Sequence, residues 1–333
     1  MGRRRLLRET LLCYLFSPLR VVPVSRFFAV LVAFLISYGV LGGAQAAEQG
    51  PVKVLTSIKP LQLIAAAVQD GVGSPDVLLP PGASPHHYAL RPSDVRRLGG
   101  ADLFYWIGPQ MENFLERPLQ SRSKPTVAVA TLPGLKLRHF AADESGSHDD
   151  ADEHDHDHSP GSLDEHLWLS SANARVIAAS MAADLSKADP TNAARYQANA
   201  QAFATRLDAV DAKLKAQVAP IVGKPFFVFH EAFDYFEDAY GLKHAGVFTV
   251  AAEVQPGAQH VAAMRARLQQ VGKTCVFSEP PMRPRLAETL TAGLPVKLAE
   301  LDALGGFNAA TANGYEQLLS KLGDDLVGCL GSL

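Results

Sequence analysis

Residues 191–219 read TNAARYQANAQAFATRLDAVDAKLKAQVA, and this stretch decides the fold that the sequence predicts. It contains neither glycine nor proline, and its apolar residues lie three or four positions apart, as on one buried face of a helix: Phe203, Leu207, Val210 and Leu214. A helix of this length would extend about 43 Å, enough to run along two lobes. We therefore predict a linking helix over 191–219, capped at its start by Thr191.

Strand-like and helix-like segments alternate on both sides of this helix. Before it, strands are expected at 52–58, 76–80, 101–108 and 126–130, and helices at 61–70, from Ser93 onward and at 170–190. After it, strands are expected at 225–230, 274–280 and 295–301, and helices at 231–241 and 284–293. This order is typical of an α/β fold with mainly parallel sheets.

The sequence thus predicts two α/β lobes, 47–190 and 220–333, joined by one long rigid helix. In open α/β sheets the ligand binds beyond the carboxyl ends of the strands. Two such lobes facing each other leave a cleft between them, and clefts of this kind are where small ligands bind. We therefore expect the functional site in the cleft between the lobes.

The N-terminal residues 1–46 have the features of a secretory signal. Arg26 precedes the apolar run 27–41, and the small residues of Ala44-Gln45-Ala46 follow it. An apolar run of about 15 residues is short of the roughly 20 that span a bilayer, although an N-terminal membrane anchor is the alternative interpretation. We expect cleavage near Ala46 and a periplasmic protein.

Charge and cysteine content narrow the function further. Ten acidic residues and no basic one fall within 143–165, and the rest of the predicted mature chain is close to neutral. This balance gives no electrostatic basis for binding nucleic acid. Outside the signal only Cys275 and Cys329 remain, an even number that suggests one disulfide in an oxidising compartment, the alternative being two buried thiols.

Three histidines stand at the ends of predicted strands or loops. His86 lies in the loop after the second strand, His166 ends the acidic segment, and His230 ends an apolar strand. Three neutral imidazoles suit Zn²⁺, with a fourth position for water or a carboxylate. Oxygen-rich sites, by contrast, are typical of Mg²⁺, Ca²⁺ and Mn²⁺. The fourth ligand is expected to be Asp302, Glu279 or water.

Four segments of the chain carry a family resemblance: PHHYALRPSD (85–94), EHLWLS (165–170), FFVFHEAF (226–233) and EVQPGAQ (253–259). In combination they resemble the ZnuA-type proteins, the periplasmic metal-binding components of zinc ABC importers. The resemblance covers about 52–333. It implies two α/β lobes bridged by a rigid helix, metal ligands at His86, His166 and His230, and a disulfide between the two cysteines.

At some positions this sequence differs from the pattern of the family. Some relatives have a carboxylate directly before the first histidine, where this chain has Pro85, and the neighbouring His87 is an alternative ligand. Relatives selective for Mn²⁺ use the position of Asp302 as a ligand, whereas in zinc members a ligand or water stands there. The expected partners are a membrane permease and an ATPase subunit, and the chain itself is expected to be a monomer.

The segment 143–162 is highly charged, repetitive and poor in apolar residues, so we expect it to be disordered. Its imidazoles suggest an auxiliary metal-binding loop that collects zinc weakly beside the cleft, and the alternative is a solvated spacer. The histidines of this loop are His148, His154, His156 and His158.

The predicted function is capture of Zn²⁺ in the periplasm and delivery to an ABC permease, without catalysis by this chain. A zinc-dependent hydrolase with Glu231 or Glu279 as the base is one alternative, but the sequence has no HExxH motif and its histidines are dispersed. A binding protein for Mn²⁺ or Fe²⁺ import, or an adhesin of the same fold, is the other.

Overall fold

The computed structural model describes residues 50–140, 161–249, 257–280, 285–306 and 308–333. Contacts between Cα atoms divide the chain into Met1–Gly50 and one compact unit, Pro51–Leu333, to which all that follows refers. The predicted signal sequence, its cleavage site and nearly all of the predicted disordered loop lie outside the described residues. The same holds for the four histidines of that loop.

Two four-stranded parallel sheets form the framework of the unit. The first has the order β2-β1-β3-β4, with strands β1 (Val54–Thr56), β2 (Asp76–Val77), β3 (Leu103–Trp106) and β4 (Thr126–Ala128). The second has the order β10-β9-β7-β8, with strands β7 (Phe226–His230), β8 (Gly246–Thr249), β9 (Thr274–Ser278) and β10 (Val296–Glu300). The predicted α/β class with mainly parallel sheets is confirmed.

A short antiparallel pair lies apart from both sheets. It consists of β5 (Arg138–His139) and β6 (Leu163–Asp164), in which Arg138 stands opposite Asp164. In the sequence, β5 comes shortly before residues 141–160 and β6 shortly after them. The sequence does not predict this pair, because strands of two residues are too short to show a periodic pattern.

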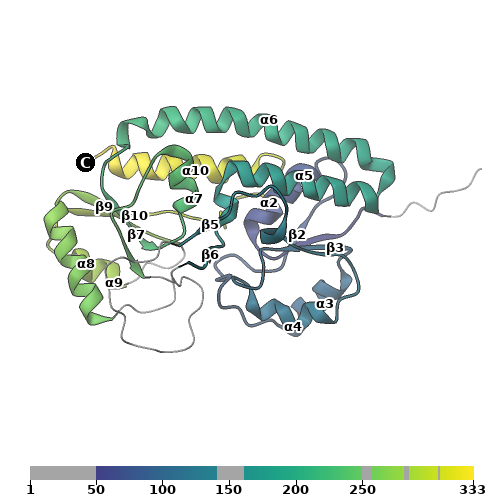
Figure 1. The fold of residues 1–333 in the computed structure, drawn as a ribbon, viewed down its shortest axis with the longest axis horizontal. Helices are drawn as coiled ribbons and strands as arrows, with labels where there is room; N and C mark the ends of the chain where they lie inside the picture. The colour runs from purple at the N-terminus through teal and green to yellow at the C-terminus, as the bar shows by residue number, and fades with distance from the viewer. Residues whose placement is uncertain (1–49, 141–160, 250–256, 281–284, 307) are drawn as a thin grey trace, which may run out of the picture. The chain divides into compact units, whose positions relative to one another are not determined.

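Helices pack around the sheets (Figure 1). In the first half they are α2 (Lys59–Val68), α3 (Pro92–Gly100), α4 (Glu116–Gln120) and α5 (Ser171–Ala188). In the second half they are α7 (Asp234–Tyr240), α8 (Ala258–Val271), α9 (Arg285–Thr291) and α10 (Gly314–Leu330). The Ser170 hydroxyl caps α5 by accepting the Asn173 N–H at 3.3 Å, which satisfies one donor of the first turn.

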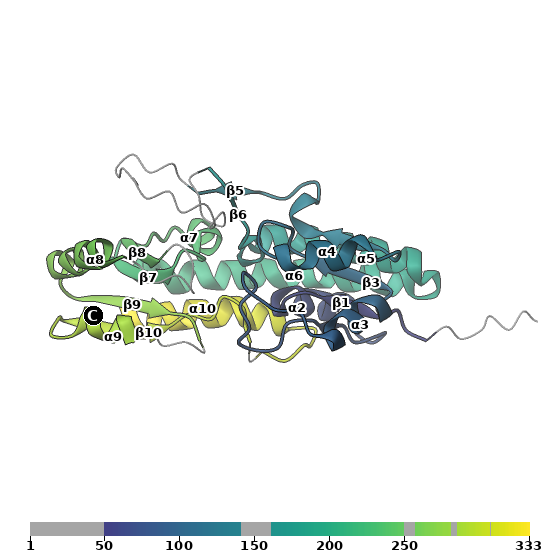
Figure 2. The ribbon, with the colours of Figure 1, turned by 90° about the horizontal axis from the view of Figure 1, so that it is seen from below.

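The long helix α6 (Ala193–Val218) joins the two halves. It contacts α2 and α5 on one side and α7 and α10 on the other, and Figures 1 and 2 both show it extending past the strands of both sheets. Phe203, Leu207 and Leu214 are fully buried on its inner face, as the spacing predicts. The assignment of the two lobes to 47–190 and 220–333 stays a prediction.

The start of α6 differs from the prediction. Thr191 does not cap the helix, because Pro190–Asn192 form a 3₁₀ turn and the Asp189 carboxylate accepts the Asn192 N–H at 3.3 Å. The α-helix therefore begins at Ala193. Its far end passes into another 3₁₀ turn at Ala219–Ile221, so helical backbone covers the predicted range in three pieces.

Two hydrophobic cores support the sheets. The larger one is continuous from the first sheet through α6 and α10 to one face of the second sheet, where Phe226 and Val228 point into it. The smaller one lies on the opposite face, where Phe227 and Phe229 pack with residues of α8 and α9. Alternate residues of β7 thus serve different cores, as the period of two in a strand requires.

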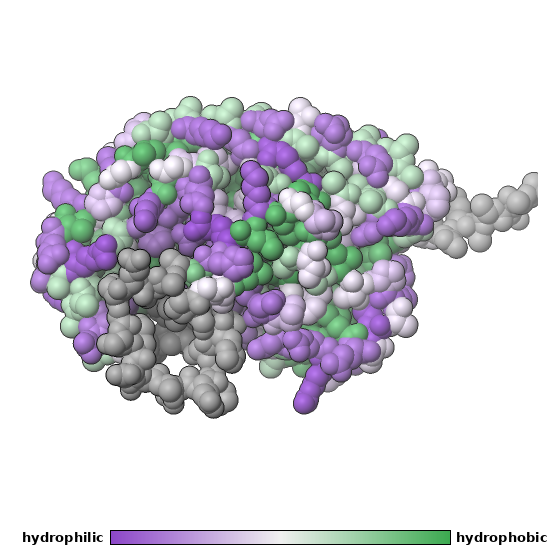
Figure 3. Space-filling model, in the orientation of Figure 1, coloured by the Kyte–Doolittle hydropathy of each residue, from purple (hydrophilic) through white to green (hydrophobic). Residues whose placement is uncertain are grey.

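The predicted disulfide is present and ties α10 to the second sheet. Cys275 in β9 is bonded to Cys329 in α10. On the outside, hydrophilic side chains predominate over the face seen in Figure 3, with an apolar group near its middle. Within the ranges described above, no helix is both long and apolar enough to cross a membrane.

Candidate metal centre

Three imidazoles that are far apart in the sequence meet inside the protein. His86 comes from the loop between β2 and α3, His166 follows β6, and His230 is the last residue of β7. Their ring centroids are 5.6 Å apart for His86 and His166, 5.5 Å for His86 and His230, and 5.0 Å for His166 and His230. All three residues are buried. The three histidine rings therefore lie next to one another, as expected from the sequence.

The spacing of the ring nitrogens fits a metal ion. One nitrogen from each ring lies within 4.8 Å of the nitrogens from the other two. Zinc–nitrogen bonds of about 2.0–2.1 Å in a tetrahedron place the nitrogens about 3.4 Å apart, so small side-chain movements suffice to close on an ion. His87, which follows His86 in the sequence, is exposed at the surface and does not belong to this buried group of three histidines.

Local backbone bonds fix two of the three residues. The His86 N–H donates to the Ser84 hydroxyl at 3.2 Å, within the loop that leaves β2. The His166 N–H donates to Asp164 Oδ1 at 3.0 Å, immediately before the 3₁₀ helix Leu167–Leu169. His230 needs no such bond, because its backbone belongs to a central strand of the second sheet.

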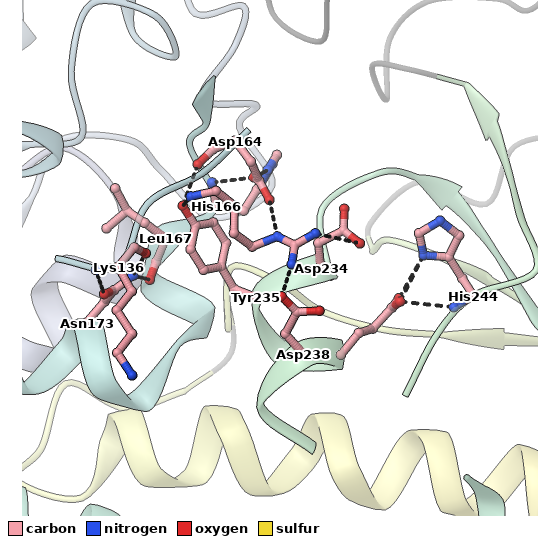
Figure 4. A network of polar contacts seen from close by, with 11 residues as sticks. Lys136, Asp164, His166, Leu167, Asn173, Asp234, Tyr235, Asp238 and His244 are labelled. Atoms are coloured by element: carbon pink, nitrogen blue, oxygen red, sulfur yellow. Dashed lines mark hydrogen bonds and ion pairs between the residues drawn. The ribbon is translucent and has the colours of Figure 1, made fainter. Parts of the chain in front are cut away.

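Carboxylates orient two of the rings. Asp164 Oδ1 lies 2.9 Å from Nδ1 of His166, as Figure 4 shows, and Glu279 Oε1 lies 2.9 Å from Nδ1 of His230. A metal-binding histidine commonly donates its second N–H to such an acceptor, which fixes the tautomer and makes the ring a stronger ligand. With Nδ1 of both rings engaged in this way, Nε2 is the nitrogen that each ring has left to offer a metal ion. Sequence reasoning did not anticipate Asp164 in this role.

Burial keeps several carboxyls near the centre from ionising easily. Burial raises the pKa of Asp164 to about 7, against the opposing effect of the His166 backbone N–H and of Arg138. Burial also raises the pKa of Glu231 to about 7, and the charge of Asp234 adds to the shift. A divalent cation beside these groups would favour their ionised forms.

Glu279 and Asp302, the two carboxylates considered as a fourth ligand, are both engaged in hydrogen bonds within the protein. The bond of Glu279 is the one to His230 described above. Asp302 Oδ1 accepts the N–H groups of Leu304 at 3.0 Å and Gly305 at 2.8 Å, and its Oδ2 accepts that of Gly306 at 2.9 Å. Burial, reinforced by Glu279, raises the pKa of Asp302. Among the residues with described side chains, the close group of ligand atoms around His86 contains the three histidines and not Asp302.

A second group of potential ligands lies on and beyond α7. Asp234, Glu237 and His244 also bring ligand atoms within 4.8 Å of one another. Both carboxylate oxygens of Glu237 lie 3.0 Å from Nδ1 of His244, and Asp234 Oδ1 is 3.7 Å from Arg138. Because these charges are already paired within the protein, the group is best explained as a partly buried ion-pair cluster, in which only Glu237 is fully buried.

Comparison with known proteins places this architecture in a family. Residues 54–329 match the family model described as "Zinc-uptake complex component A periplasmic". The chain is 40% identical over 291 residues to the high-affinity zinc uptake system protein ZnuA of Yersinia pestis, covering 83% of this chain and 91% of the relative.

Solved structures agree with the fold. The solute-binding protein FpvC of Pseudomonas aeruginosa, solved with Ni²⁺, superposes with a TM-score of 0.69 at 22% identity, over 85% of this chain and 97% of that one. The periplasmic zinc-binding protein TroA of Treponema pallidum superposes with a TM-score of 0.68 at 24% identity, over 84% and 99%. With the family model matching nearly all of the compact unit, the chain belongs to the ZnuA family.

Proposed function

We propose that this protein captures Zn²⁺ in the periplasm through His86, His166 and His230 and delivers it to the permease of an ABC importer. The observation that carries the proposal is the convergence of the three buried imidazoles, with ring nitrogens within 4.8 Å of one another. A separate ATPase subunit would supply the energy for import, and the chain would act as an exported monomer.

The donor set is the reason for choosing zinc. Imidazole nitrogen suits Zn²⁺, whereas Mn²⁺ sites usually include more carboxylate oxygen. Two carboxylates beside the rings, Asp164 and Glu279, face the Nδ1 atoms of His166 and His230 and so act as their hydrogen-bond acceptors. The naming of the Yersinia pestis relative as a zinc uptake protein supports the same choice.

Binding without hydrolysis follows from the same contacts. A hydrolase would need a base that faces the open position on the metal. Glu279 is bonded to His230, so its carboxylate is engaged as the acceptor of that ring, and among the described residues Glu231 is not part of the group of ligand atoms that converges at the three rings. We propose that both residues tune the site and that water holds the fourth position, with Asp302 as the alternative.

Replacing the three histidines one at a time tests the proposal. His86→Ala, His166→Ala and His230→Ala should each weaken zinc binding at least tenfold in a chelator competition titration. The matched control is His87→Ala, which removes an exposed imidazole next to His86 and should change nothing. Equal affinity of all four variants, or tighter binding of Mn²⁺ than Zn²⁺ by the wild type, would contradict the assignment.

The histidines of the acidic segment form a second part of the proposal. His148, His154, His156 and His158 would collect zinc weakly and raise its concentration near the centre. Deleting 143–162 should lower the number of weakly bound ions while the tight site keeps its affinity. An unchanged number of bound ions would assign the segment to a spacer.

A further inference from the structure

The geometry points to Tyr235, assisted by Arg138, as a positioning residue for the metal centre. We propose that these two residues fasten the β5–β6 pair, which leads into His166, onto helix α7, which follows His230, and so set the distance between the two rings. The inference rests on the proposed zinc site and adds to it residues outside the ligand set. We call these contacts the α7 clasp.

The β5–β6 pair cannot hold its position alone. Its strands have two residues each, and the hydrogen bonds next to them join Phe140 N–H to Ser162 O at 3.0 Å and Gly161 N–H to Phe140 O at 2.9 Å. An isolated two-stranded hairpin is at best marginally stable in water. His166 follows directly from this pair, so its placement needs a contact from elsewhere.

The hydroxyl of Tyr235 supplies one such contact, in addition to the Asn173 amide that donates to the Leu167 carbonyl at 3.2 Å. Tyr235 Oη accepts the backbone N–H of Arg138 at 2.9 Å and donates to the backbone carbonyl of Asp164 at 3.0 Å. Arg138 and Asp164 stand directly opposite each other in the pair, so one side chain of α7 bonds both strands at the same register. Tyr235 is buried, and burial raises the pKa of its hydroxyl, which keeps the O–H proton in place as a donor.

The Arg138 side chain makes the second half of the α7 clasp. Its Nε lies 3.9 Å from Asp164 Oδ2, and its other nitrogens pair with Asp234 at 3.7 Å and with Asp238, both on α7 (Figure 4). The guanidinium also lies 6.0 Å from the centre of the Tyr235 ring. One cation therefore joins the acceptor of His166 to the helix that follows His230.

The consequence concerns the centre itself. Asp164 uses its backbone carbonyl for Tyr235, its Oδ2 for Arg138 and its Oδ1 for the ring of His166. His166 and His230, whose rings are 5.0 Å apart, are thus connected through Asp164, Tyr235 and the start of α7. Loosening this connection should widen the site, weaken zinc binding and speed its release.

Tyr235→Phe tests the inference with Tyr240→Phe as a matched control. Tyr240 lies on the same helix, is also buried, and donates to Asp211 Oδ1 at 2.7 Å, away from the α7 clasp. We expect Tyr235→Phe to weaken zinc binding about tenfold, within the range found for residues that orient metal ligands, and to raise the dissociation rate. The zinc affinity of Tyr240→Phe should stay within about twofold of the wild-type value, which is well below the tenfold or greater loss typical of residues that orient metal ligands.

A spectroscopic readout separates positioning from general stability. Both variants are expected to lower the thermal stability of the metal-free protein, since Tyr235→Phe loses two hydrogen bonds and Tyr240→Phe loses one. The visible absorption spectrum of the Co²⁺-loaded protein reports the geometry of its ligands, and it should shift in Tyr235→Phe and not in Tyr240→Phe. Arg138→Gln, which keeps the backbone bond to Tyr235, should show a smaller shift in the same direction.

The outcomes distinguish this inference from the proposed function. Tight zinc binding by the wild type, with Tyr235→Phe and Arg138→Gln both unchanged in affinity and in spectrum, would overturn the α7 clasp and leave the zinc site standing. Loss of tight binding in His166→Ala together with the predicted effect of Tyr235→Phe supports both. Weak binding by the wild type overturns both.

Discussion

Glu279 Oε1 lies 2.9 Å from Nδ1 of His230, and this contact links the ends of two neighbouring strands of the second sheet. The carboxylate accepts the Nδ1–H of the ring and so leaves Nε2 as the nitrogen with a lone pair to offer. It stabilises the charge that a bound cation places on the ring. This makes Glu279 a support for the proposed ligand His230, although the sequence alone left Glu279 open as a ligand or a base.

Replacing Glu279 should weaken zinc binding, and the loss should be larger when the oxygen acceptor is removed than when only the charge is removed. Glu279→Gln keeps an oxygen acceptor and should cost about tenfold in affinity, whereas Glu279→Ala removes the acceptor and should cost up to about a hundredfold. Chelator competition measures both. Glu288→Gln on α9, which changes an exposed carboxylate, is the control and should leave the affinity unaltered. Equal effects of the Gln and Ala variants would indicate that only the charge matters.

Asp302 should prove less important for zinc than the histidines. Its carboxylate already accepts three backbone N–H groups from residues 304–306, and Asp302→Asn keeps one of the acceptor oxygens. We expect Asp302→Asn to weaken zinc binding by less than the tenfold that marks the loss of a supporting group. A loss as large as that in His86→Ala would identify Asp302 as the fourth ligand in place of water.

Glu112 should make the metal-free protein less stable as the pH rises. Burial raises the pKa of Glu112 from 4.5 to about 7, even though its Oε2 accepts the Ile107 N–H at 2.6 Å. Between these two values the folded state holds a proton that the unfolded state has released, so the free energy of unfolding falls with increasing pH. The full loss above pH 7 would be about 3 kcal/mol.

Glu112→Gln tests this directly, because glutamine keeps an acceptor for Ile107 and cannot ionise. Thermal melts of the metal-free protein should show the variant more stable than the wild type at pH 8, with the difference vanishing near pH 4.5. A constant difference across this range would show that Glu112 does not titrate in it.

The disulfide should matter for stability and little for metal binding. It closes a separation of 54 residues between Cys275 and Cys329, for which the chain-entropy estimate is a stabilisation of about 3–5 kcal/mol. The double variant Cys275→Ala/Cys329→Ala should therefore melt at a clearly lower temperature while it binds zinc as tightly as the wild type. Loss of zinc affinity in the folded variant would show that α10 helps to hold the centre.

Much of the fold could be predicted from local patterns. The buried strands of both sheets are short apolar runs, and α6 shows an uninterrupted helical spacing that the packing of Phe203 and Leu207 bears out. Helix α10 was missed because Gly323 and Gly328 interrupt its helical pattern. The structure explains Gly323: a Cβ there would overlap the Leu214 side chain, so the glycine permits close packing of α10 on α6.

The sequence singled out the three histidines that converge at the candidate centre, and it did not predict the residues of the α7 clasp that hold His166 in place. His86, His166 and His230 mark ends of strands and loops, and the family motifs single them out. The contacts of Asp164, Arg138 and Tyr235 depend instead on a two-residue strand pair and on a helix from the other half of the chain. Such long-range contacts leave no trace in sequence spacing.

The position of zinc in crystals of the loaded protein tests the central claim most directly. An anomalous difference map at the zinc absorption edge should show one strong peak about 2.0–2.1 Å from a ring nitrogen of each of His86, His166 and His230, with Nε2 as the ligand atom of the latter two. A strong peak bound elsewhere, or rings of zinc-loaded protein with no peak among them, would contradict it.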